Sequence, residues 1–270
     1  MLRTRILTAT VLACILLAGL FLLPPAWGVV GFGAVFTIGA WEWSGFGAPA
    51  GQGARAAYAA CIALLLLLAW KWSAAPRHLP LLLTLACLWW VIALAWLIAA
   101  PSRHTRALTL LCGPLVLVPA FVALGRLLVT TRGFAQGPQV VLWLVLLVIA
   151  ADIGAYFAGR RFGRRKLAPR VSPGKTLEGA IGGLSMVALV AWGGALRFGL
   201  PPLETVAFGC GVGIFSVIGD LTESMFKRAA GLKDSGALLP GHGGLLDRID
   251  SVTAAASLYA LGLFGSGAVA

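Results

Sequence analysis

The chain has 270 residues, of which 60% are hydrophobic and only 11% are charged, and its mean hydropathy is +0.94. These values exclude an ordinary soluble domain and indicate a polytopic membrane protein with most of its mass inside the bilayer. The net charge of +12 could suggest nucleic-acid binding. However, the sequence has no basic helix and no platform of interleaved aromatic and basic residues, so we expect no nucleic-acid partner.

Apolar stretches of about 17–23 residues, long enough to span a bilayer, recur along the whole chain. They cover residues 6–23, 27–43, 56–72, 79–99, 107–128, 139–157, 176–196, 203–226 and 251–269. The second stretch is rich in glycine and contains Glu42, so it could be re-entrant instead of spanning. The pattern predicts an all-α polytopic integral membrane protein with about nine transmembrane helices.

The basic residues predict the orientation of these spans. With the N-terminus inside, most of the 21 Lys and Arg residues, Arg103 among them, fall on the cytoplasmic side, as the positive-inside rule requires. We predict a single membrane domain over residues 1–270. Residues 1–128 form its N-terminal helical scaffold, and residues 138–270 form the catalytic helices and cytoplasmic loops.

Acidic residues that are distant in sequence are predicted to reach one membrane depth, near the cytoplasmic ends of the C-terminal helices. Carboxylates at that depth are costly unless they are paired, hydrated or bound to a metal, so their clustering favours a functional site. These residues are Asp152, Glu178, Asp220, Glu223, Asp247 and Asp250.

The acids between residues 220 and 250 flank a glycine-rich segment. Asp220 and Glu223 are three residues apart, as are Asp247 and Asp250, so each pair can share one face of a helix. The simpler alternative is a lattice of surface ion pairs with neighbouring basic residues, which contributes little stability. Oxygen ligands from two helices beside a glycine loop suit Mg²⁺, which also keeps water and phosphate oxygens as ligands.

The segment at 172–176, Ser-Pro-Gly-Lys-Thr, resembles the end of a P-loop but lacks the earlier glycine of that pattern. It can be a helix start capped by Thr176. Alternatively, Lys175 and the free amides of the helix end hold a phosphate group. We favour phosphate binding, because seven basic residues lie between positions 160 and 175.

Three further polar residues have alternative interpretations. Asp152 lies one helical turn before Tyr156 among small residues. This pattern suits close helix packing, but an acid in a membrane span is by default a functional candidate, which we favour. His242 lies between glycines and is either a structural hydrogen-bonding group or a catalytic one. Glu42, which lies between two tryptophans, is either a simple interfacial residue or a functional one.

The C-terminal half contains a long pattern of charged, glycine and proline residues at fixed spacing. Its members are Ser224, Lys227, Arg228, Lys233, Asp234, Pro240, Gly241, His242, Gly243, Gly244, Asp247, Arg248 and Asp250. This pattern closely resembles the signature of phosphatidate cytidylyltransferases, also called CDP-diacylglycerol synthases. The stretches at 152–159 and 172–179 are similar to upstream blocks of that family.

The resemblance implies condensation of CTP with phosphatidic acid to give CDP-diacylglycerol and pyrophosphate for phospholipid biosynthesis. It implies Mg²⁺ as cofactor, with a second cation as an open alternative, and it suggests a homodimer. The expected location is a bacterial inner membrane, among membrane lipids, with the active site facing the cytoplasm.

The expected site residues fall into three groups. Those with catalytic roles are Asp220, Lys227, Lys233, His242 and Asp247, and those with metal-binding roles are Asp220, Glu223, Asp247 and Asp250. Those expected to bind substrates are Asp152, Tyr156, Ser172, Lys175, Thr176, Glu178, Ser224, Arg228, Asp234, Gly243, Gly244 and Arg248.

Three other classes of protein fit the sequence less well. A transporter for an anionic solute would place its charges near the bilayer midplane, with access from both sides. A CDP-alcohol phosphotransferase would contain an Asp-Gly-x-x-Ala-Arg pattern, which this sequence lacks. An inactive scaffold would have little need for the complete signature. An enzyme with its site at one membrane face is therefore favoured.

Overall fold

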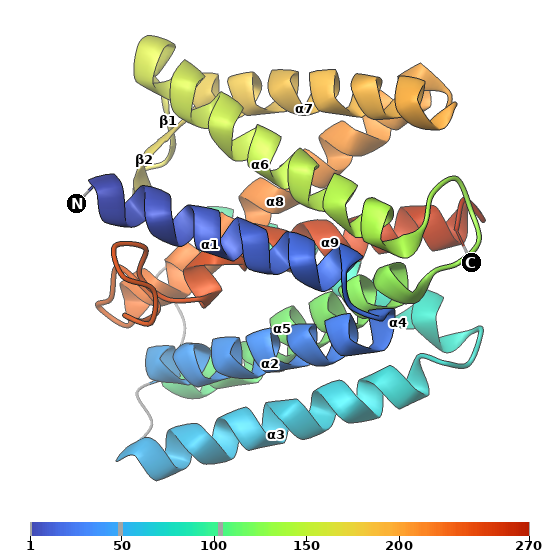
Figure 1. Ribbon diagram of the computed structural model, residues 1–270. Coiled ribbons are helices and arrows are strands. Elements are labelled where there is room, and N and C mark those ends of the chain that lie inside the picture. The colour runs from blue at the N-terminus through green and yellow to red at the C-terminus, as the bar shows by residue number, and fades with distance from the viewer. Residues whose placement is uncertain (1, 48–50, 102–104, 270) are drawn as a thin grey trace.

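The computed structural model describes residues 2–47, 51–101 and 105–269, and within them the chain forms a bundle of α-helices (Figure 1). The helices are α1 (Leu2–Phe21), α2 (Pro25–Ser44), α3 (Gly51–Trp72), α4 (His78–Ala99), α5 (Arg106–Val129), α6 (Gly137–Phe162), α7 (Leu177–Phe198), α8 (Pro202–Ala229) and α9 (Asp250–Gly265). The short elements are the 3₁₀ helices η1 (Gly45–Gly47) and η2 (Leu246–Arg248) and the strands β1 (Lys166–Ala168) and β2 (Ser172–Thr176).

Successive helices run back and forth along the bundle. The N-terminus, the β1–β2 hairpin and the loop after α8 therefore lie at one end, which we call the loop end, and the C-terminus lies at the other (Figure 1). Arg103 lies outside the described residues. The helix predicted at 27–43 is continuous over 20 residues and crosses the bundle between its two ends (Figure 1).

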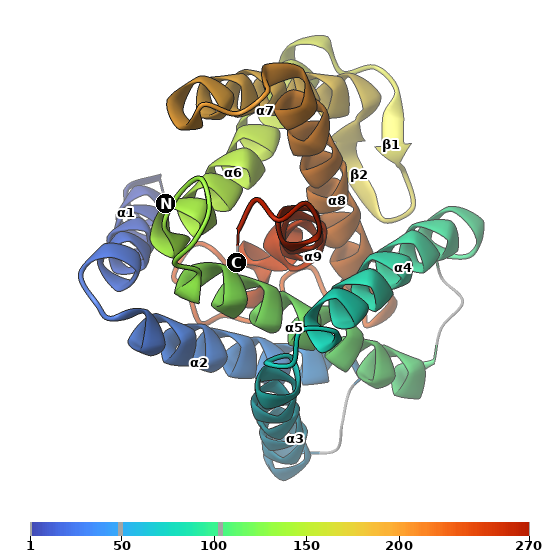
Figure 2. The same cartoon turned by 90° about the vertical axis from the view of Figure 1, so that its right-hand side faces the viewer.

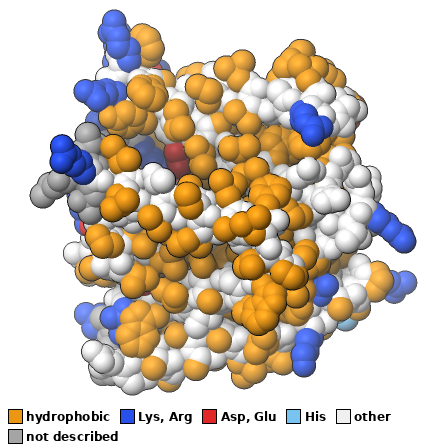
Figure 3. All heavy atoms as spheres, viewed as in Figure 1, with side chains coloured by type: hydrophobic (Ala, Val, Ile, Leu, Met, Phe, Trp, Pro, Cys, Tyr) orange, Lys and Arg blue, Asp and Glu red, His pale blue; other side chains and the backbone are white. Residues whose placement is uncertain are grey.

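Within the described residues, six helices, α3 to α8, are long and apolar enough to cross a membrane. Hydrophobic side chains cover the middle of the bundle, while basic side chains gather toward its ends (Figure 3). These features confirm a polytopic membrane protein. The count of nine spans stays a prediction, because α1, α2 and α9 are not among these six helices. The apolar part of α1 is shorter than a full span.

Helix α9 occupies the middle of the bundle, with α4, α5, α6 and α8 around it (Figure 2). Its buried positions are mostly small residues such as Ser251, Thr253 and Ala254 to Ala256, which let neighbouring helices approach closely. Because α9 is central, the acids at its N-terminal end lie beside the end of α8.

Helices α6 and α7 pack through glycines. A Cβ atom at Gly154 would lie 2.5 Å from the carbonyl oxygen of Gly182, and one at Gly183 would lie 2.7 Å from that of Ala151. The close-packing role considered for the residues around Asp152 is therefore confirmed for Gly154, and this packing fixes where α6 presents Asp152 at the loop end.

The β1–β2 hairpin between α6 and α7 was not expected from the sequence. Its antiparallel register pairs Lys166 with Thr176 and Ala168 with Ser172. Strands of three and five residues are too short to produce a recognisable alternation of polar and apolar side chains. At its end, Thr176 accepts a hydrogen bond from the Gly179 N–H at 3.1 Å, so the capping role of Thr176 is confirmed.

Candidate active site

A buried lysine between two carboxylates forms the centre of the site. The ammonium nitrogen of Lys227 lies 3.1 Å from Glu223 Oε1 and 2.5 Å from Asp247 Oδ1. All three side chains are at most 8% exposed. Such a cluster is costly to bury unless its charges are compensated, and here the single ammonium group of Lys227 is shared between two carboxylates. The alternative of a surface ion-pair lattice is wrong for these residues, because they are not on the surface.

Asp247 is held from three directions. Its Oδ1 faces Lys227, and its Oδ2 accepts hydrogen bonds from the N–H groups of Ser235 at 2.8 Å and Gly244 at 2.9 Å. Burial by itself would raise the pKa of Asp247. However, the Lys227 ammonium and the two backbone N–H groups outweigh burial, and the pKa lies below its usual value. Asp247 is therefore a fixed, ionised acceptor at neutral pH.

A second ion pair joins the hairpin to α8. Lys175 on β2 pairs with Asp220 on α8, and the Ser224 hydroxyl donates to Asp220 Oδ1 at 3.2 Å. Both charged side chains remain about a quarter exposed, at 28% and 24%. The packing therefore brings Lys175 to the acids of α8, and the phosphate-binding role of Lys175 stays a prediction.

The remaining central acids lie within electrostatic range of these pairs. Asp152 on α6 interacts with Asp220, Lys175 and Arg248. Asp250, at the start of α9, interacts with Glu223, Asp220 and Lys227. Five of the six predicted acids thus gather in one charged region, drawn from α6, α8, η2 and α9.

Glu178 is the acid that lies apart. Its Oε2 accepts hydrogen bonds from the backbone N–H groups of Arg164 at 3.0 Å and Arg165 at 3.2 Å. This arrangement ties the first turn of α7 to the start of the hairpin. Glu178 therefore contacts the backbone of the hairpin and none of the central acids.

Arg228 is also engaged with backbone. Its guanidinium donates to the carbonyl oxygens of Val171 at 3.3 Å and Leu232 at 3.2 Å. These contacts link the end of α8 to the hairpin and to the loop that follows α8. Ser172, which pairs with Ala168 in the hairpin, likewise lies in the framework around the site.

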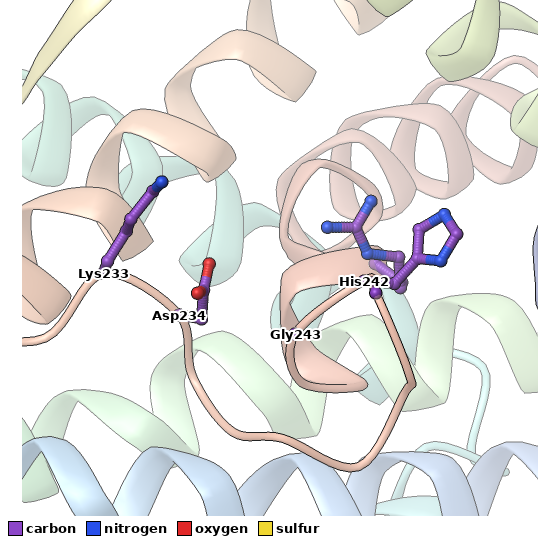
Figure 4. Close-up of a pocket in the computed structure, with 6 residues that line it drawn as sticks. Lys233, Asp234, His242 and Gly243 are labelled. Atoms are coloured by element: carbon purple, nitrogen blue, oxygen red, sulfur yellow. The ribbon is translucent and has the colours of Figure 1, made fainter. Parts of the chain in front are cut away.

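Two cavities open beside the central cluster. The first, of about 570 Å³, is lined by Lys233, Asp234, Gly241, His242, Gly243 and Arg248. The loop between α8 and η2 runs past this cavity twice. Lys233 and Asp234 lie on its first limb, and His242 and Gly243 lie on its second limb (Figure 4). Gly241 and Gly243 have φ values of 77° and 80°, which favour glycine and allow the loop to turn.

The second cavity, of about 360 Å³, lies between α6, β2 and α7. Its polar lining includes Asp152, Tyr156, Arg160, Lys175 and Thr176. The apolar face of the bundle in Figure 3 has a hollow near the loop end in which acidic and basic atoms are recessed. The site thus has one cavity within the loop and another beside the helices.

The sequence left the role of Glu42 open. In the structure, Glu42 contacts the segment that follows α8. The Glu42 side chain reaches from α2 and accepts hydrogen bonds from Ser235, Leu245 and Leu246. Its isolated charge in an apolar stretch between two tryptophans was the signal. The loop that it contacts could not be identified from that signal.

The acidic residues have the chemistry of magnesium ligands. Glu223 Oε2 is buried and has no hydrogen-bond partner among the described residues, so it could accept a cation. Across the described ranges, no group of three or more His, Cys, Asp and Glu residues has a metal-binding arrangement. Lysine ammonium groups contact Asp220, Glu223 and Asp247.

Helices that are long and apolar enough to cross a membrane, packed around a buried charged cluster with two cavities beside it, define a polytopic membrane protein. Residues 3–264 match the model of the cytidylyltransferase family. The chain belongs to this family, as its signature residues predicted.

Bacterial relatives are similar to the chain over nearly its whole length. It is 44% identical over 278 residues to a protein of Pseudomonas aeruginosa named phosphatidate cytidylyltransferase, covering 99% of this chain and 98% of that protein. A protein of the same name from Haemophilus influenzae is 39% identical, covering 96% of this chain and 97% of its own. A third protein of this name, from Brucella suis, is 49% identical over 138 residues, which is 48% of each chain.

Proposed function

We propose that this protein is a CTP:phosphatidate cytidylyltransferase, which condenses CTP with phosphatidic acid to give CDP-diacylglycerol and pyrophosphate. Membership of the cytidylyltransferase family and the likeness to full-length relatives of that name support this activity. The observation that carries the proposal is the buried cluster of Lys227, Glu223 and Asp247 beside a basic cavity, in the segment that contains the family signature.

The reaction needs alignment and charge neutralisation more than proton transfer. A phosphate oxygen of phosphatidic acid attacks the α-phosphorus of CTP, a new P–O bond forms, and the bond to the β-phosphate breaks to release pyrophosphate. The attacking monoester is already ionised at neutral pH, so little help from a general base is required. The protein must bring two anions together in line and relieve the negative charge on the leaving group.

The two cavities suggest a division of labour. The loop cavity, with Lys233, His242 and Arg248, would hold the phosphates of CTP. The helix cavity, with Arg160 and Lys175, would hold the phosphate of the lipid. Lys227, between the two carboxylates, would offset part of their negative charge and fix Asp247.

We further propose that Mg²⁺ binds to carboxylates of Asp220, Glu223, Asp247 and Asp250. Their oxygen ligands and the unpartnered Glu223 Oε2 support this assignment. When bound, the cation would neutralise phosphate oxygens and stabilise charge on the departing pyrophosphate. Lys175, which contacts Asp220 and is partly exposed, would then be free to turn toward substrate phosphates.

The proposed membrane arrangement has nine spans in the inner membrane, with the loop end facing the cytoplasm. The back-and-forth course of the nine α-helices in the described part of the chain supports this arrangement, as do the basic residues at 160–175 and 227–248, which lie at the loop end (Figure 1). CTP would enter from the cytosol, and phosphatidic acid would enter from the adjacent leaflet. The homodimer remains a prediction from the family resemblance.

The test is turnover of phosphatidic acid by the purified, detergent-solubilised protein with CTP and Mg²⁺. We expect release of pyrophosphate together with a CDP-lipid, and loss of both when the cation is chelated. Turnover that persists without divalent cations would refute the magnesium assignment alone. A well-folded sample that produces no CDP-lipid from several phosphatidic acids would refute the activity.

A further inference from the structure

Glu42 is a buried carboxylate that is satisfied entirely by the loop after α8. It is 4% exposed. Its Oε1 accepts from the Leu245 N–H at 3.0 Å, and its Oε2 accepts from the Leu246 N–H at 2.8 Å and the Ser235 hydroxyl at 2.9 Å. These donors come from residues about 200 positions later in the chain, as the separation of 203 between Glu42 and Leu245 shows.

Ser235 connects Glu42 to the central cluster. Its hydroxyl donates to Glu42, and its backbone N–H donates to Asp247 Oδ2 at 2.8 Å. Leu245 and Leu246, which also bind Glu42, immediately precede Asp247. Glu42 therefore holds both limbs of the loop, and Asp247 directly follows one of these points and accepts a hydrogen bond from the other.

The loop backbone passes so close to the Glu42 carboxylate that side chains are excluded there. A Cβ atom at Gly236 would lie 2.6 Å from Glu42 Oε1. A Cβ atom at Gly244 would overlap both Ser235 Oγ and Glu42 Oε2. These two glycines therefore let the loop approach the carboxylate, and each lies next to a residue that contacts Asp247 or Glu42.

The end of α2 that presents Glu42 is firmly anchored. The Trp43 indole donates to the carbonyl oxygen of Thr109 at 2.8 Å, and its ring lies 5.2 Å from that of Phe226, the neighbour of Lys227 on α8. The carbonyl oxygen of Trp41 accepts from the Arg55 guanidinium at 3.0 Å. Glu42 thus projects from a fixed platform toward the loop.

A purely space-filling role would not need a carboxylate. Burying an ionised group is costly unless it is paired or hydrogen-bonded. The ion pairs found among the described residues do not include Glu42. The three hydrogen-bond donors of the loop offset the cost of burying this carboxylate. They do so only while the loop keeps the conformation that points them at Glu42.

We propose that Glu42 is a positioning residue of the active site. It holds residues 235–246 in the conformation that places Asp247 and shapes the cavity between Lys233 and His242. The kinetic consequence of this inference rests on the proposed function, in which the loop cavity holds the phosphates of CTP. It gives the N-terminal half, expected to be scaffold, a direct influence on nucleotide binding.

The test compares Glu42→Gln with wild type and with Glu204→Gln, a matched control at an exposed acid in the first turn of α8. The glutamine keeps the size of the side chain but replaces one carboxylate oxygen with an NH₂ group. That group would face an N–H or hydroxyl donor of the loop, so a hydrogen bond is lost. We expect kcat/KM for CTP to fall by about tenfold to a hundredfold, because hydrogen bonds to a charged acceptor are lost. The KM for phosphatidic acid should stay within about twofold, because the cavity beside α6 and α7 is not contacted by Glu42.

Hydrogen–deuterium exchange provides a readout that does not depend on activity. In Glu42→Gln, amides of residues 235–246 should exchange faster than in wild type, while those of α6 and α7 should not. A Ser235→Ala change should produce part of the same effect. The double variant should lose less than the sum of the two single losses, because both remove one contact.

Unchanged exchange in the loop together with an unchanged KM for CTP would overturn the proposal. A uniform fall in kcat with faster exchange throughout the bundle would also overturn it, because that pattern indicates general destabilisation. If wild-type protein shows no turnover, the proposed activity fails. The exchange comparison still decides whether Glu42 holds the loop.

Discussion

Replacement of Asp247 by asparagine is the most direct test of the central cluster. The change keeps the size of the side chain but replaces one carboxylate oxygen with an NH₂ group. Asp247 now accepts from Lys227 through one oxygen and from Ser235 and Gly244 through the other. Whichever way the amide is oriented, one of these sets of donors loses its acceptor.

The less costly orientation turns the NH₂ group toward Lys227, because the two backbone N–H groups then keep an oxygen. Lys227 retains Glu223 at 3.1 Å but loses its contact of 2.5 Å with Asp247. A hydrogen bond to a charged group contributes about 1.5–3 kcal/mol, so the free energy of unfolding should fall by about that amount. The protein should remain folded, since a buried lysine still has one carboxylate partner.

The loss of activity should be larger than the loss of stability suggests. About 3 kcal/mol of lost transition-state stabilisation corresponds to somewhat more than a hundredfold in rate. Asp247 is also a proposed magnesium ligand, so we expect turnover to fall by about a hundredfold or more, toward background.

The assay is CTP-dependent pyrophosphate release in mixed micelles of detergent and phosphatidic acid. It is run beside size-exclusion chromatography and thermal unfolding of the same sample. Glu204→Gln serves as a control for removal of one acidic charge at an exposed position. Near-wild-type turnover by folded Asp247→Asn would refute the role of Asp247 in the metal and substrate site.

Three further predictions address other parts of the molecule. Lys175→Ala removes the partner of Asp220 and should lower kcat/KM for phosphatidic acid by about tenfold or more; unchanged kinetics would leave that segment as a helix start only. Chelation of divalent cations should abolish pyrophosphate release, and excess Mg²⁺ should restore it; activity that resists chelation contradicts the proposed cation. Arg126→Met removes hydrogen bonds to Trp70 and Ser73 at the end opposite the site and should cost about 1–3 kcal/mol of stability with normal KM values; altered KM values would contradict a purely structural role.

The sequence by itself determined the class of the protein and the order of its helices. The apolar stretches at 6–23 through 251–269 correspond to the nine helices of the described chain. They could be read because length and hydropathy are local properties that the bilayer constrains strongly. The signature residues likewise identified the family, since their types and spacings can be read directly from the chain.

The partners of the charged groups were decided only by the tertiary structure. Spacing placed Asp220 and Glu223 near each other, but it could not assign Lys175 to Asp220 or place Lys227 between Glu223 and Asp247. It also could not separate Glu178, which binds the hairpin backbone, from the acids that gather at the centre.

The contact between Glu42 and the loop is the clearest example of this difference. The sequence marks Glu42 as an unusual charge in an apolar stretch, and it marks residues 240–244 as a glycine-rich loop. Nothing local relates the two, because their contact depends on how α2, α8 and α9 pack. Packing of whole helices sets which distant groups share the low-dielectric interior, and an acid buried there is stable only where that packing supplies its donors.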